Sequence, residues 1–530
     1  MATAVWSVDP RTGKRREEVA TEATPAEVDQ AVRAAHAARP ALADRAVRAA
    51  FLRTAADLLD EAGERVVEAS DAETALGPGR LTGELARTTY QLRAFADLVD
   101  EGAFLGVMID RPDPDLKPIP RPDLRRYKVP IGVVAVYAAS NFPLAFSVPG
   151  GDTASALAAG CPVVVKAHPD HPATSELCAS VLRRAAERHG LPPGVVGLVH
   201  GFDAGVELVR HPLVAAAGFT GSVRGGRALF DAAAARPVPI PFHGELGSLN
   251  PVVVTEAAAE ERAAEIGSGL AGSMTLGTGQ FCVKPGLVLA PAGEAGDRLL
   301  DALTDAVSAT DPGVLLDSRM RDNFVAGVRE RLGLPEVESP VTPGGSGELA
   351  VSAGFLTVPA ARLAEEGGKA GDGGTGGDGG NGGDGGEGHE LLLEECFGPV
   401  TVVARYTGED EVLAVLDRLP GNLTATVHVG EREAAEEDGT GARLLAGLTP
   451  LAGRLLVNGW PTGVAVAPAQ HHGGPYPATT STSTSVGATA VERWLRPVAY
   501  QNTPPALLPP ELRDDNPLGL PRLVDGAPER

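Results

Sequence analysis

Residues 131–166 read IGVVAVYAASNFPLAFSVPGGDTASALAAGCPVVVK, and this stretch decides the fold. Two short apolar runs, at 133–137 and 163–165, flank a helical pattern at 152–159. Apolar runs of this kind are typical of buried strands in a parallel sheet, which helices cover on both faces. The stretch therefore predicts a strand, a crossover helix and a second, parallel strand.

The same alternation continues along the chain and extends the predicted sheet. Further strands are expected at 195–199 and 217–220, with helices at 174–189 and 227–235. Strands that alternate with helices indicate an α/β fold with a doubly wound sheet. A second α/β region spans 246–457, and a glycine-rich insertion at 367–388 interrupts it. Because such a composition cannot bury a core, we expect a mobile, solvated loop there.

The two ends of the chain carry other signals. Thr24-Pro25-Ala26-Glu27 is a capping box with proline at the first helical position, and further helical stretches follow up to residue 100. Residues 111–130, rich in proline and charge, predict an extended arm. The alternating run 479–485 is expected to pair as an edge strand with another subunit, and the proline-rich tail 501–530 to wrap along the surface.

The composition indicates a globular protein with an acidic surface. The chain has 530 residues, 43% of them hydrophobic, and a formal net charge of −23. Such a charge repels phosphate backbones and anionic membranes, so we expect neither nucleic acid nor a membrane as a partner. With no signal peptide and no apolar run of about 18 residues in the sequence, we expect a cytoplasmic protein. Its four cysteines form no C-x-x-C pair, and we predict no metal site.

The segment Gly277-Thr-Gly-Gln-Phe-Cys-Val-Lys-Pro-Gly286 marks Cys282 as a candidate nucleophile. Glycines before the thiol let the backbone approach a substrate closely. Near the start of a helix, such a thiol has a lowered pKa and reacts as a thiolate. The alternative is that Cys282 is a small, buried apolar residue.

Three other polar residues are candidates for the same site. Glu245 lies among glycines just before an apolar strand, where it suits a cleft but can equally be a turn residue or a partner for a helix dipole. Asn141 follows strand 133–137 at its carboxyl end, where ligands of open α/β sheets bind, although it is also an ordinary turn residue near a proline. Glu395 lies just before Phe397-Gly-Pro399, and its alternative is a solvated loop carboxylate.

A glycine-rich turn and a lysine are candidates for holding a cofactor. The turn Gly221-Ser-Val-Arg-Gly-Gly226 opens a helix after strand 217–220, and free N–H groups there can bind a pyrophosphate. This turn is not the G-x-G-x-x-G dinucleotide fingerprint, so alone it is weak evidence. Lys166 ends strand 163–165, where its ammonium can bind a ribose hydroxyl or simply be solvated.

In their order and spacing, these motifs resemble the aldehyde dehydrogenase superfamily over essentially the whole chain. The resemblance implies an aldehyde dehydrogenase-like fold, with two doubly wound, Rossmann-like α/β domains and a small β arm for oligomerisation. It also assigns roles: Asn141 to the oxyanion loop, Glu245 as general base, Cys282 as nucleophile, Lys166, Gly221, Ser222 and Gly226 to the cofactor site, and Glu395 and Phe397 to the nicotinamide ribose.

The same resemblance divides the chain into domains. It implies a dinucleotide-binding domain at 1–110 and 131–245, a catalytic domain at 246–457, oligomerisation elements at 111–130 and 479–500, and a C-terminal tail at 501–530. The implied assembly is a homodimer or homotetramer.

Stretches such as Asn458-Gly-Trp460 and His472-Gly-Gly-Pro-Tyr-Pro-Ala478 are similar to one branch of the superfamily, the 2,5-dioxovalerate (α-ketoglutaric semialdehyde) and NADP-dependent fatty-aldehyde dehydrogenases. The branch implies oxidation of 2,5-dioxovalerate to 2-oxoglutarate, in sugar-acid or hydroxyproline catabolism, through a thiohemiacetal and a thioester. A long-chain aldehyde dehydrogenase, or a CoA-acylating or reductive relative, is the alternative. Phe142, Phe281 and Trp460 are expected to line the substrate channel, but no arginine stands out to bind a substrate carboxylate.

Two further expectations concern protons and the choice of cofactor. Burial of Glu245 should raise its pKa towards neutrality, as suits a general base for the deacylating water. No histidine can be assigned to Cys282, which argues against a thiol hydrolase.

Pro169 stands where NAD-preferring members of the superfamily often carry glutamate, so we expect both cofactors to be used, with NADP at least competitive. Arg210 and His168 are candidates to meet the 2′-phosphate.

Overall fold

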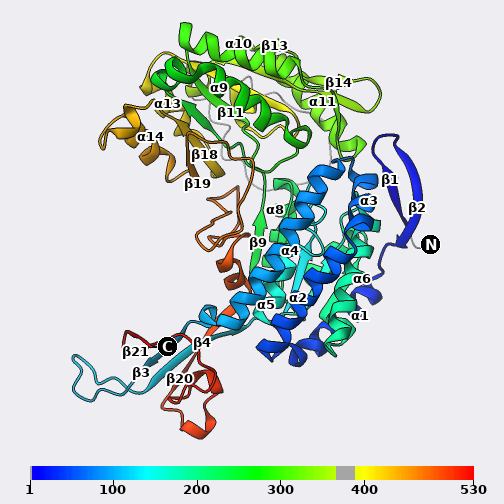
Figure 1. The fold of residues 1–530 in the computed structure, drawn as a ribbon, viewed down its shortest axis with the longest axis vertical. Coiled ribbons are helices and arrows are strands. Elements are labelled where there is room, and N and C mark those ends of the chain that lie inside the picture. Colours follow the sequence, from blue (N-terminus) through cyan, green and yellow to red (C-terminus); the bar gives the residue numbers. More distant parts are fainter. Residues whose placement is uncertain (1–2, 366–387, 530) are drawn as a thin grey trace.

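The computed structural model describes residues 3–365 and 388–529, which form two lobes and a projecting arm (Figure 1). The first lobe is built on a five-stranded parallel sheet in the order β7-β6-β5-β8-β9. Its strands are β5 (Val133–Tyr137), β6 (Val163–Lys166), β7 (Val196–Val199), β8 (Val214–Thr220) and β9 (Phe242–Glu245). The strand–helix–strand unit predicted from residues 131–166 is confirmed.

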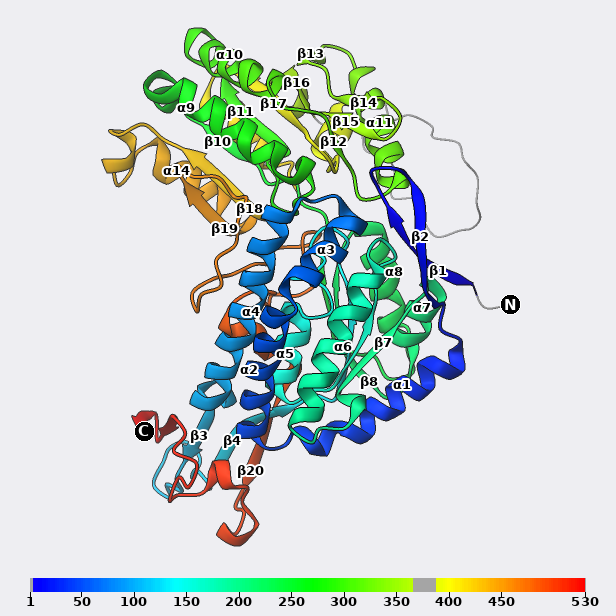
Figure 2. The same cartoon turned by 45° about the vertical axis from the view of Figure 1, so that its right-hand side comes forward.

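Helices cover both faces of this sheet (Figure 2). They are α1 (Pro25–Ala38), α2 (Arg45–Glu61), α3 (Gly63–Thr74), α4 (Pro78–Glu101), α5 (Gly151–Ala159), α6 (Pro172–Arg188), α7 (Phe202–Arg210) and α8 (Val223–Ala234). Because side chains alternate along a strand, Val134 and Val136 of β5 pack in the core with α2, α5 and α6, whereas Val133 and Ala135 pack with α1 and α7. Both faces are therefore apolar, as the continuous run predicts.

The second lobe contains a seven-stranded sheet in the order β13-β16-β17-β11-β10-β18-β19, parallel except for β13. Its strands are β10 (Val252–Val254), β11 (Leu287–Pro291), β13 (Glu338–Val341), β16 (Gly354–Pro359), β17 (Val400–Tyr406), β18 (Asn422–His428) and β19 (Ala452–Val457). Helices α9 (Glu256–Thr275) and α10 (Glu294–Ser308) cover one face, and α11 (Ser318–Leu332), α12 (Ala360–Ala364), α13 (Glu409–Leu416) and α14 (Thr440–Leu448) the other. A small sheet of β12 (Gly313–Val314), β14 (Gly344–Ser346) and β15 (Ala350–Ser352) lies beside α11.

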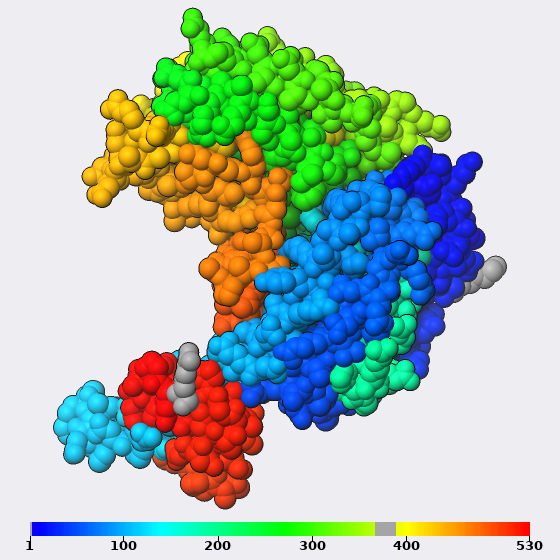
Figure 3. Space-filling view, viewed as in Figure 1, coloured from blue at the N-terminus to red at the C-terminus, as the bar shows by residue number. Residues whose placement is uncertain are grey.

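The arm is a five-stranded sheet that projects from the first lobe, at the end away from the second (Figure 1). Its order is β20-β4-β3-β21-β22, and its strands are β3 (Val107–Asp110), β4 (Leu124–Pro130), β20 (Leu495–Gln501), β21 (Arg522–Val524) and β22 (Ala527–Glu529). The tail was expected to wrap along the surface, but its last residues instead add two strands to this sheet. In the space-filling view a hollow separates the arm from the overhanging second lobe (Figure 3).

The N-terminal hairpin of β1 (Ala4–Asp9) and β2 (Lys14–Thr21) has no counterpart in the sequence prediction, because β2 is polar and largely exposed. The capping box of α1 is confirmed, since the Thr24 hydroxyl accepts from the Glu27 N–H and the Glu27 carboxylate accepts from the Thr24 N–H. The glycine-rich insertion lies, apart from Gly388, outside the described residues. Within the described ranges, no helix is both long and apolar enough to cross a membrane.

Candidate active site

The site lies where the carboxyl ends of the first sheet's strands meet the loop between α9 and β11 and the segment that follows β19. Glu245 is the last residue of β9, and Asn141 follows β5 by four positions. Because all five strands are parallel, these ends share one edge of the sheet, which is where open α/β sheets bind their ligands. Asn141 and Glu245 are buried, with 7% and 2% of their surface exposed.

The loop that carries Cys282 has an unusual backbone. Gly277, Thr278 and Gly279 all have left-handed φ angles, of 56°, 58° and 67°. A side chain at Gly279 would also clash with the backbone carbonyl of Gly398, so the nucleophile loop packs directly against the loop that carries Glu395. No helix begins at Cys282, contrary to the expectation from sequence. Burial, together with the charge of Glu245, instead raises the pKa of the Cys282 thiol.

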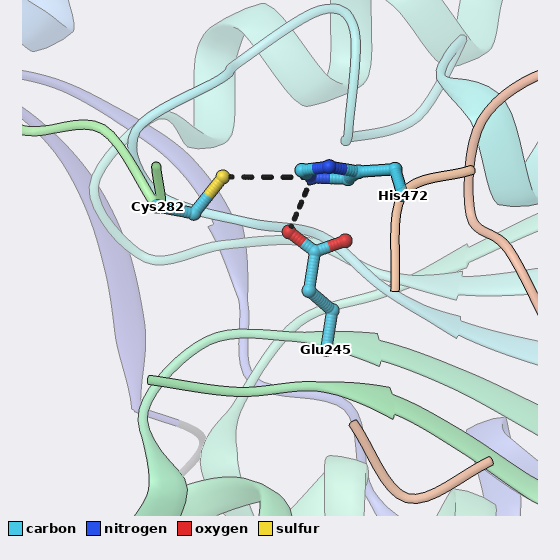
Figure 4. A group of neighbouring side chains, drawn as sticks. All are labelled: Glu245, Cys282 and His472. Atoms are coloured by element: carbon cyan, nitrogen blue, oxygen red, sulfur yellow. Dashed lines mark hydrogen bonds and ion pairs between the residues drawn. The ribbon is translucent and has the colours of Figure 1, made fainter. Parts of the chain in front are cut away.

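Cys282 and Glu245 converge on a histidine, His472 (Figure 4). The His472 Nε2 atom lies 3.6 Å from the Cys282 Sγ and 3.0 Å from the Glu245 Oε1. The second carboxylate oxygen of Glu245 accepts a hydrogen bond of 2.8 Å from the Ser485 hydroxyl. The imidazole is fully buried, and the Thr484 hydroxyl accepts from the His472 backbone N–H. A thiol, an imidazole and a carboxylate therefore share one hydrogen-bonding network.

This network reverses the expected pKa of Glu245. Burial raises the pKa of Glu245, as the sequence argument supposes, but the charge of His472 and the hydrogen bonds from His472, Ser485 and Cys282 together outweigh burial and lower it to about 2. A carboxylate with so low a pKa holds a proton poorly, so Glu245 by itself is a weak base. Imidazole is the side chain suited to take up protons near neutral pH, and here the carboxylate orients it.

Sequence reasoning missed the role of His472. The segment His472–Ala478 resembles the family, but the sequence assigns no histidine to Cys282, whereas the structure places His472 beside it. One ligand atom from each of Glu245, Cys282 and His472 lies within 4.8 Å of the others, so these three residues could hold a metal ion. The sequence predicts no metal site. The only local signal was a pair of histidines before two glycines, and nothing in it points to residue 282.

Residues 479–485, expected to pair with another subunit, pack around Glu245 instead. Thr479 forms a β-bridge with Glu245, and the Thr480 N–H donates to the carbonyl of Gly244. The Thr480 hydroxyl accepts from the Gly244 N–H and donates to the carbonyl of Phe242. The alternating threonines and serines therefore supply hydrogen bonds along β9 within the same chain.

Asn141 lies against the nucleophile loop, as its expected role requires. Its amide nitrogen Nδ2 donates to the carbonyl of Gln280, 3.0 Å away, which uses one of its two N–H groups. The Cys282 backbone N–H has no acceptor among the described residues. The second N–H of Asn141 and the N–H of Cys282 thus have no acceptor in the described residues, and both can serve an oxygen that becomes negative.

Of the three residues expected to line the substrate channel, the structure brings two together. The rings of Phe142 and Phe281 meet edge to face with their centroids 5.1 Å apart, and Phe146 follows at 5.4 Å from Phe142. Trp460 instead packs against Gly269 of α9 and lies 4.7 Å from the ring of His428, in the core of the second lobe.

The expected cofactor residues lie on the same edge of the first sheet. Lys166 ends β6 and is 8% exposed, and its ammonium has no hydrogen-bond acceptor in residues 3–365 and 388–529. Burial lowers its pKa to about 8. Ser222 caps α8, its hydroxyl accepting from the Gly225 N–H, and a side chain at Gly226 would clash with Leu246. The first turn of α8 follows the strand end after Gly221, so these residues fit a pyrophosphate and a ribose.

Glu395 joins the site from the second lobe. Its carboxylate packs against Gly247, two residues after Glu245, and burial raises its pKa to about 7. Lys284, which sequence reasoning passed over, is buried and donates to the carbonyls of Cys396 and Val400. It ties the Glu395 loop to the nucleophile loop. Phe397 lies half-buried on the same segment.

Neither candidate for binding a 2′-phosphate suits that role. Arg210 ends α7 just before β8 begins, so it lies at the amino-terminal edge of the sheet, opposite Lys166. Burial lowers the pKa of His168 well below its usual value and favours the neutral ring. His168 stacks on His171, and its Nδ1 accepts from the Asp170 N–H.

Comparison with known proteins gives the class. The sequence model of the aldehyde dehydrogenase family matches residues 2–324. The chain is 45% identical over 483 residues to α-ketoglutaric semialdehyde dehydrogenase 2 of Azospirillum brasilense, covering 91% of this chain and 87% of that protein. It is 42% identical over 510 residues to α-ketoglutaric semialdehyde dehydrogenase of Acinetobacter baylyi, covering 96% and 92%.

Solved structures share the fold. γ-Glutamyl-γ-aminobutyraldehyde dehydrogenase from Burkholderia cenocepacia superposes with a TM-score of 0.76 at 22% identity, covering 94% of this chain and 92% of that one. 1-Pyrroline-5-carboxylate dehydrogenase from Thermus with bound NAD gives 0.74 at 21% identity, covering 94% and 90%. Fold and thiol site thus define an enzyme that oxidises aldehydes. The chain belongs to the aldehyde dehydrogenase family.

Proposed function

We propose that this enzyme oxidises the aldehyde group of 2,5-dioxovalerate to give 2-oxoglutarate. The observation that carries the chemistry is the contact of the Cys282 thiol with His472 and Glu245, with Asn141 beside the same loop. The substrate rests on the two relatives named α-ketoglutaric semialdehyde dehydrogenase, whose similarity extends over nine-tenths or more of this chain.

NAD or NADP is the proposed cofactor, and it would supply the hydride acceptor that no side chain provides. Lys166 would bind a ribose hydroxyl, the first turn of α8 a phosphate, and Glu395 the second ribose. Since no carboxylate stands at Pro169, we expect NADP to compete with NAD. Comparing kcat/KM for both cofactors checks this, and a preference for NAD above about a hundredfold contradicts it.

The chain's own residues perform the remaining steps. When the sulfur of Cys282 bonds to the aldehyde carbon, its S–H bond breaks and the proton passes to His472 Nε2, 3.6 Å away. The carbonyl oxygen becomes an anion, which the Asn141 amide and the Cys282 N–H stabilise. After His472 has released that proton to solvent, water hydrolyses the thioester: its oxygen bonds to the acyl carbon as the C–S bond breaks, and its proton passes through the His472–Glu245 pair to the sulfur, which restores the thiol.

The test is a substrate screen that follows NADPH release. We expect the highest kcat/KM with 2,5-dioxovalerate, lower values with glutarate and succinate semialdehydes, and the lowest with a long-chain aldehyde. Cys282→Ala should abolish turnover, whereas Cys178→Ala, which removes a buried thiol of α6, should retain it. A long-chain aldehyde as the best substrate would overturn the assignment and favour a fatty-aldehyde dehydrogenase.

We also infer that the enzyme is a homo-oligomer. The arm carries exposed apolar side chains, among them Ile119, Leu507 and Leu523. The sheet of the second lobe ends at β19 with a strand that pairs on one side only, and its last residue, Val457, is half exposed. Unpaired edges and exposed apolar residues favour contact with a second copy.

A further inference from the structure

Helix α4 places two arginines, Arg80 and Arg87, two turns apart beside the nucleophile. Arg80 has a structural partner, because its Nη2 donates to the Asn141 carbonyl 2.5 Å away, and its guanidinium lies over the rings of Phe142 and Phe281. Arg87 lies over a third ring, with its Cζ atom 5.2 Å from the centre of Phe146.

Contacts connect Arg87 to the sulfur. The ring of Phe146 lies 6.1 Å from that of His472, whose Nε2 contacts Cys282. Burial lowers the pKa of Arg87, while the charges of Glu84, Cys282 and Glu245 are close enough to oppose that effect. The ring of Phe146 therefore stands between the guanidinium of Arg87 and the imidazole of His472.

The two Nη groups of Arg87, which are the groups that bind anions, have no hydrogen-bond acceptor in the described residues. Its Nε donates to the Val464 carbonyl at 3.3 Å, but Nη1 and Nη2 are both shielded from solvent and have no acceptor in the described residues. By contrast, Arg454 donates its two Nη atoms to the carbonyls of Gly463 and Pro461. Among the buried guanidinium groups of residues 3–365 and 388–529, only Arg87 leaves both Nη atoms unused. Such unpaired donors are costly, which suggests that a ligand completes them.

We propose that Arg87 binds the carboxylate of an ω-oxo acid whose aldehyde carbon is attacked by Cys282. The two Nη groups form a fork that matches both oxygens of a carboxylate, and the carbon chain would lie along Phe142 and Phe146. Without this cation, a substrate carboxylate would face the charges of Glu84 and Glu245, both of which act on Arg87. The inference rests on the proposed function and adds the residue that selects acidic over neutral aldehydes.

The experiment compares an acidic and a neutral aldehyde of the same length, 2,5-dioxovalerate and pentanal, at saturating cofactor. In Arg87→Met the ratio of their kcat/KM values should fall about 100-fold, mainly through KM for the acid, which corresponds to about 2.7 kcal/mol. Arg87→Lys should lie between this variant and the wild type. The control is Arg93→Met on the same helix, which removes surface ion pairs with Asp57 and Asp60 and should leave the ratio unchanged.

The melting temperature separates binding from a structural role. Because Arg87→Met removes a buried cation without breaking a strong contact, its melting temperature should not fall. An unchanged ratio, or an equal loss on both aldehydes with a lower melting temperature, overturns the inference.

A wild type that oxidises glutarate semialdehyde but not 2,5-dioxovalerate would overturn only the proposed function, and the Arg87 ratio would then be measured with glutarate semialdehyde against pentanal. A wild type that prefers pentanal to every ω-oxo acid would overturn both.

Discussion

At the scale of single residues, the site depends on one atom, the Nε2 of His472, which contacts both the thiol of Cys282 and the carboxylate of Glu245. A ring nitrogen holds one proton, so it can donate to the carboxylate or accept from the thiol but not both at once. Ionisation of Cys282 is therefore coupled to the hydrogen bond between His472 and Glu245. The raised pKa of the Cys282 thiol has other causes, namely burial and the charge of Glu245.

Replacing His472 should slow the chemical step. In His472→Asn the thiol loses its proton acceptor, and we expect kcat to fall by about 10²–10⁴. The rate at which iodoacetamide alkylates Cys282 should fall as well. Its neighbour His471, which makes no contact with the thiol or Glu245 in the described structure, is the matched control. Equal losses in His471→Asn and His472→Asn would argue that the histidines only support the loop.

The lowered pKa of Glu245 also predicts a dependence of stability on pH. Because the pKa of Glu245 falls from an ordinary 4.5 to about 2 on folding, its carboxylate stabilises the fold fully above pH 4.5. That contribution is lost as the pH falls from 4.5 towards 2. Urea unfolding of the wild type and of Glu245→Gln should therefore show the wild type losing stability relative to the variant over this interval. A constant difference between pH 7 and pH 3 would contradict the lowered pKa of Glu245.

The sequence could identify some of these residues but not their partners. Asn141, Glu245 and Cys282 stand at strand ends or among glycines, which are local patterns. His472 is 190 positions from Cys282 and 227 from Glu245, and no local pattern records that proximity. The direction of the pKa shift of Glu245 depends on His472 and Ser485, so it was equally beyond the reach of a sequence argument.

At the scale of elements, the nucleophile loop is fixed by Gly279. Its φ of 67° and the nearness of the Gly398 carbonyl both exclude a side chain. Gly279→Ala should therefore destabilise the protein by about 2–4 kcal/mol and lower activity, because the loop must move away from the Glu395 segment.

The matched control for this change is Gly272→Ala in α9. A side chain at Gly272 meets nothing within 4 Å, so this change should be neutral or stabilise the protein by about 0.5–1 kcal/mol. Urea unfolding and kcat measured on both variants check the pair. A Gly279→Ala enzyme as active and stable as the control would show that the loop tolerates a side chain.

Elements with apolar periodicity were predictable, and polar elements were not. The strand at 133–137 and the helix after Thr24 follow directly from their residues. Strand β2 has the polar sequence KRREEVAT, and its composition does not indicate a strand. It forms a strand because it pairs with β1. The threonine and serine run at 479–485 has the alternation of an edge strand, but its hydroxyls serve as hydrogen-bonding groups for β9.

At the scale of the whole molecule, both lobes contribute residues to the site. The first contributes Asn141, Lys166 and Glu245 from or just after strand ends. The second contributes Cys282 from the loop between α9 and β11, and the segment after β19 contributes His472. The arm takes no part in this network. Its five-stranded sheet contains segments more than 350 residues apart in the chain, for example β4 and β20, which pair directly. Bringing such distant segments together costs conformational entropy, and the arm lies away from the site. These two features suggest that the arm serves in assembly.

The arm therefore predicts the oligomeric state. Ile119 and Leu507 are 73% and 72% exposed on it, and a charge at either position would oppose burial in an interface. Light scattering should give a multiple of 54.3 kDa for the wild type, and a lower mass for the double variant Ile119→Asp and Leu507→Asp.

Val238→Asp is the matched control, because Val238 is equally exposed, at 72%, on the loop before β9 in the first lobe. If the double variant keeps the wild-type mass, or if Val238→Asp dissociates the enzyme equally, these arm residues do not form the interface. Since the catalytic network lies within one chain, a monomeric double variant should still release NADPH, so its activity separates assembly from catalysis.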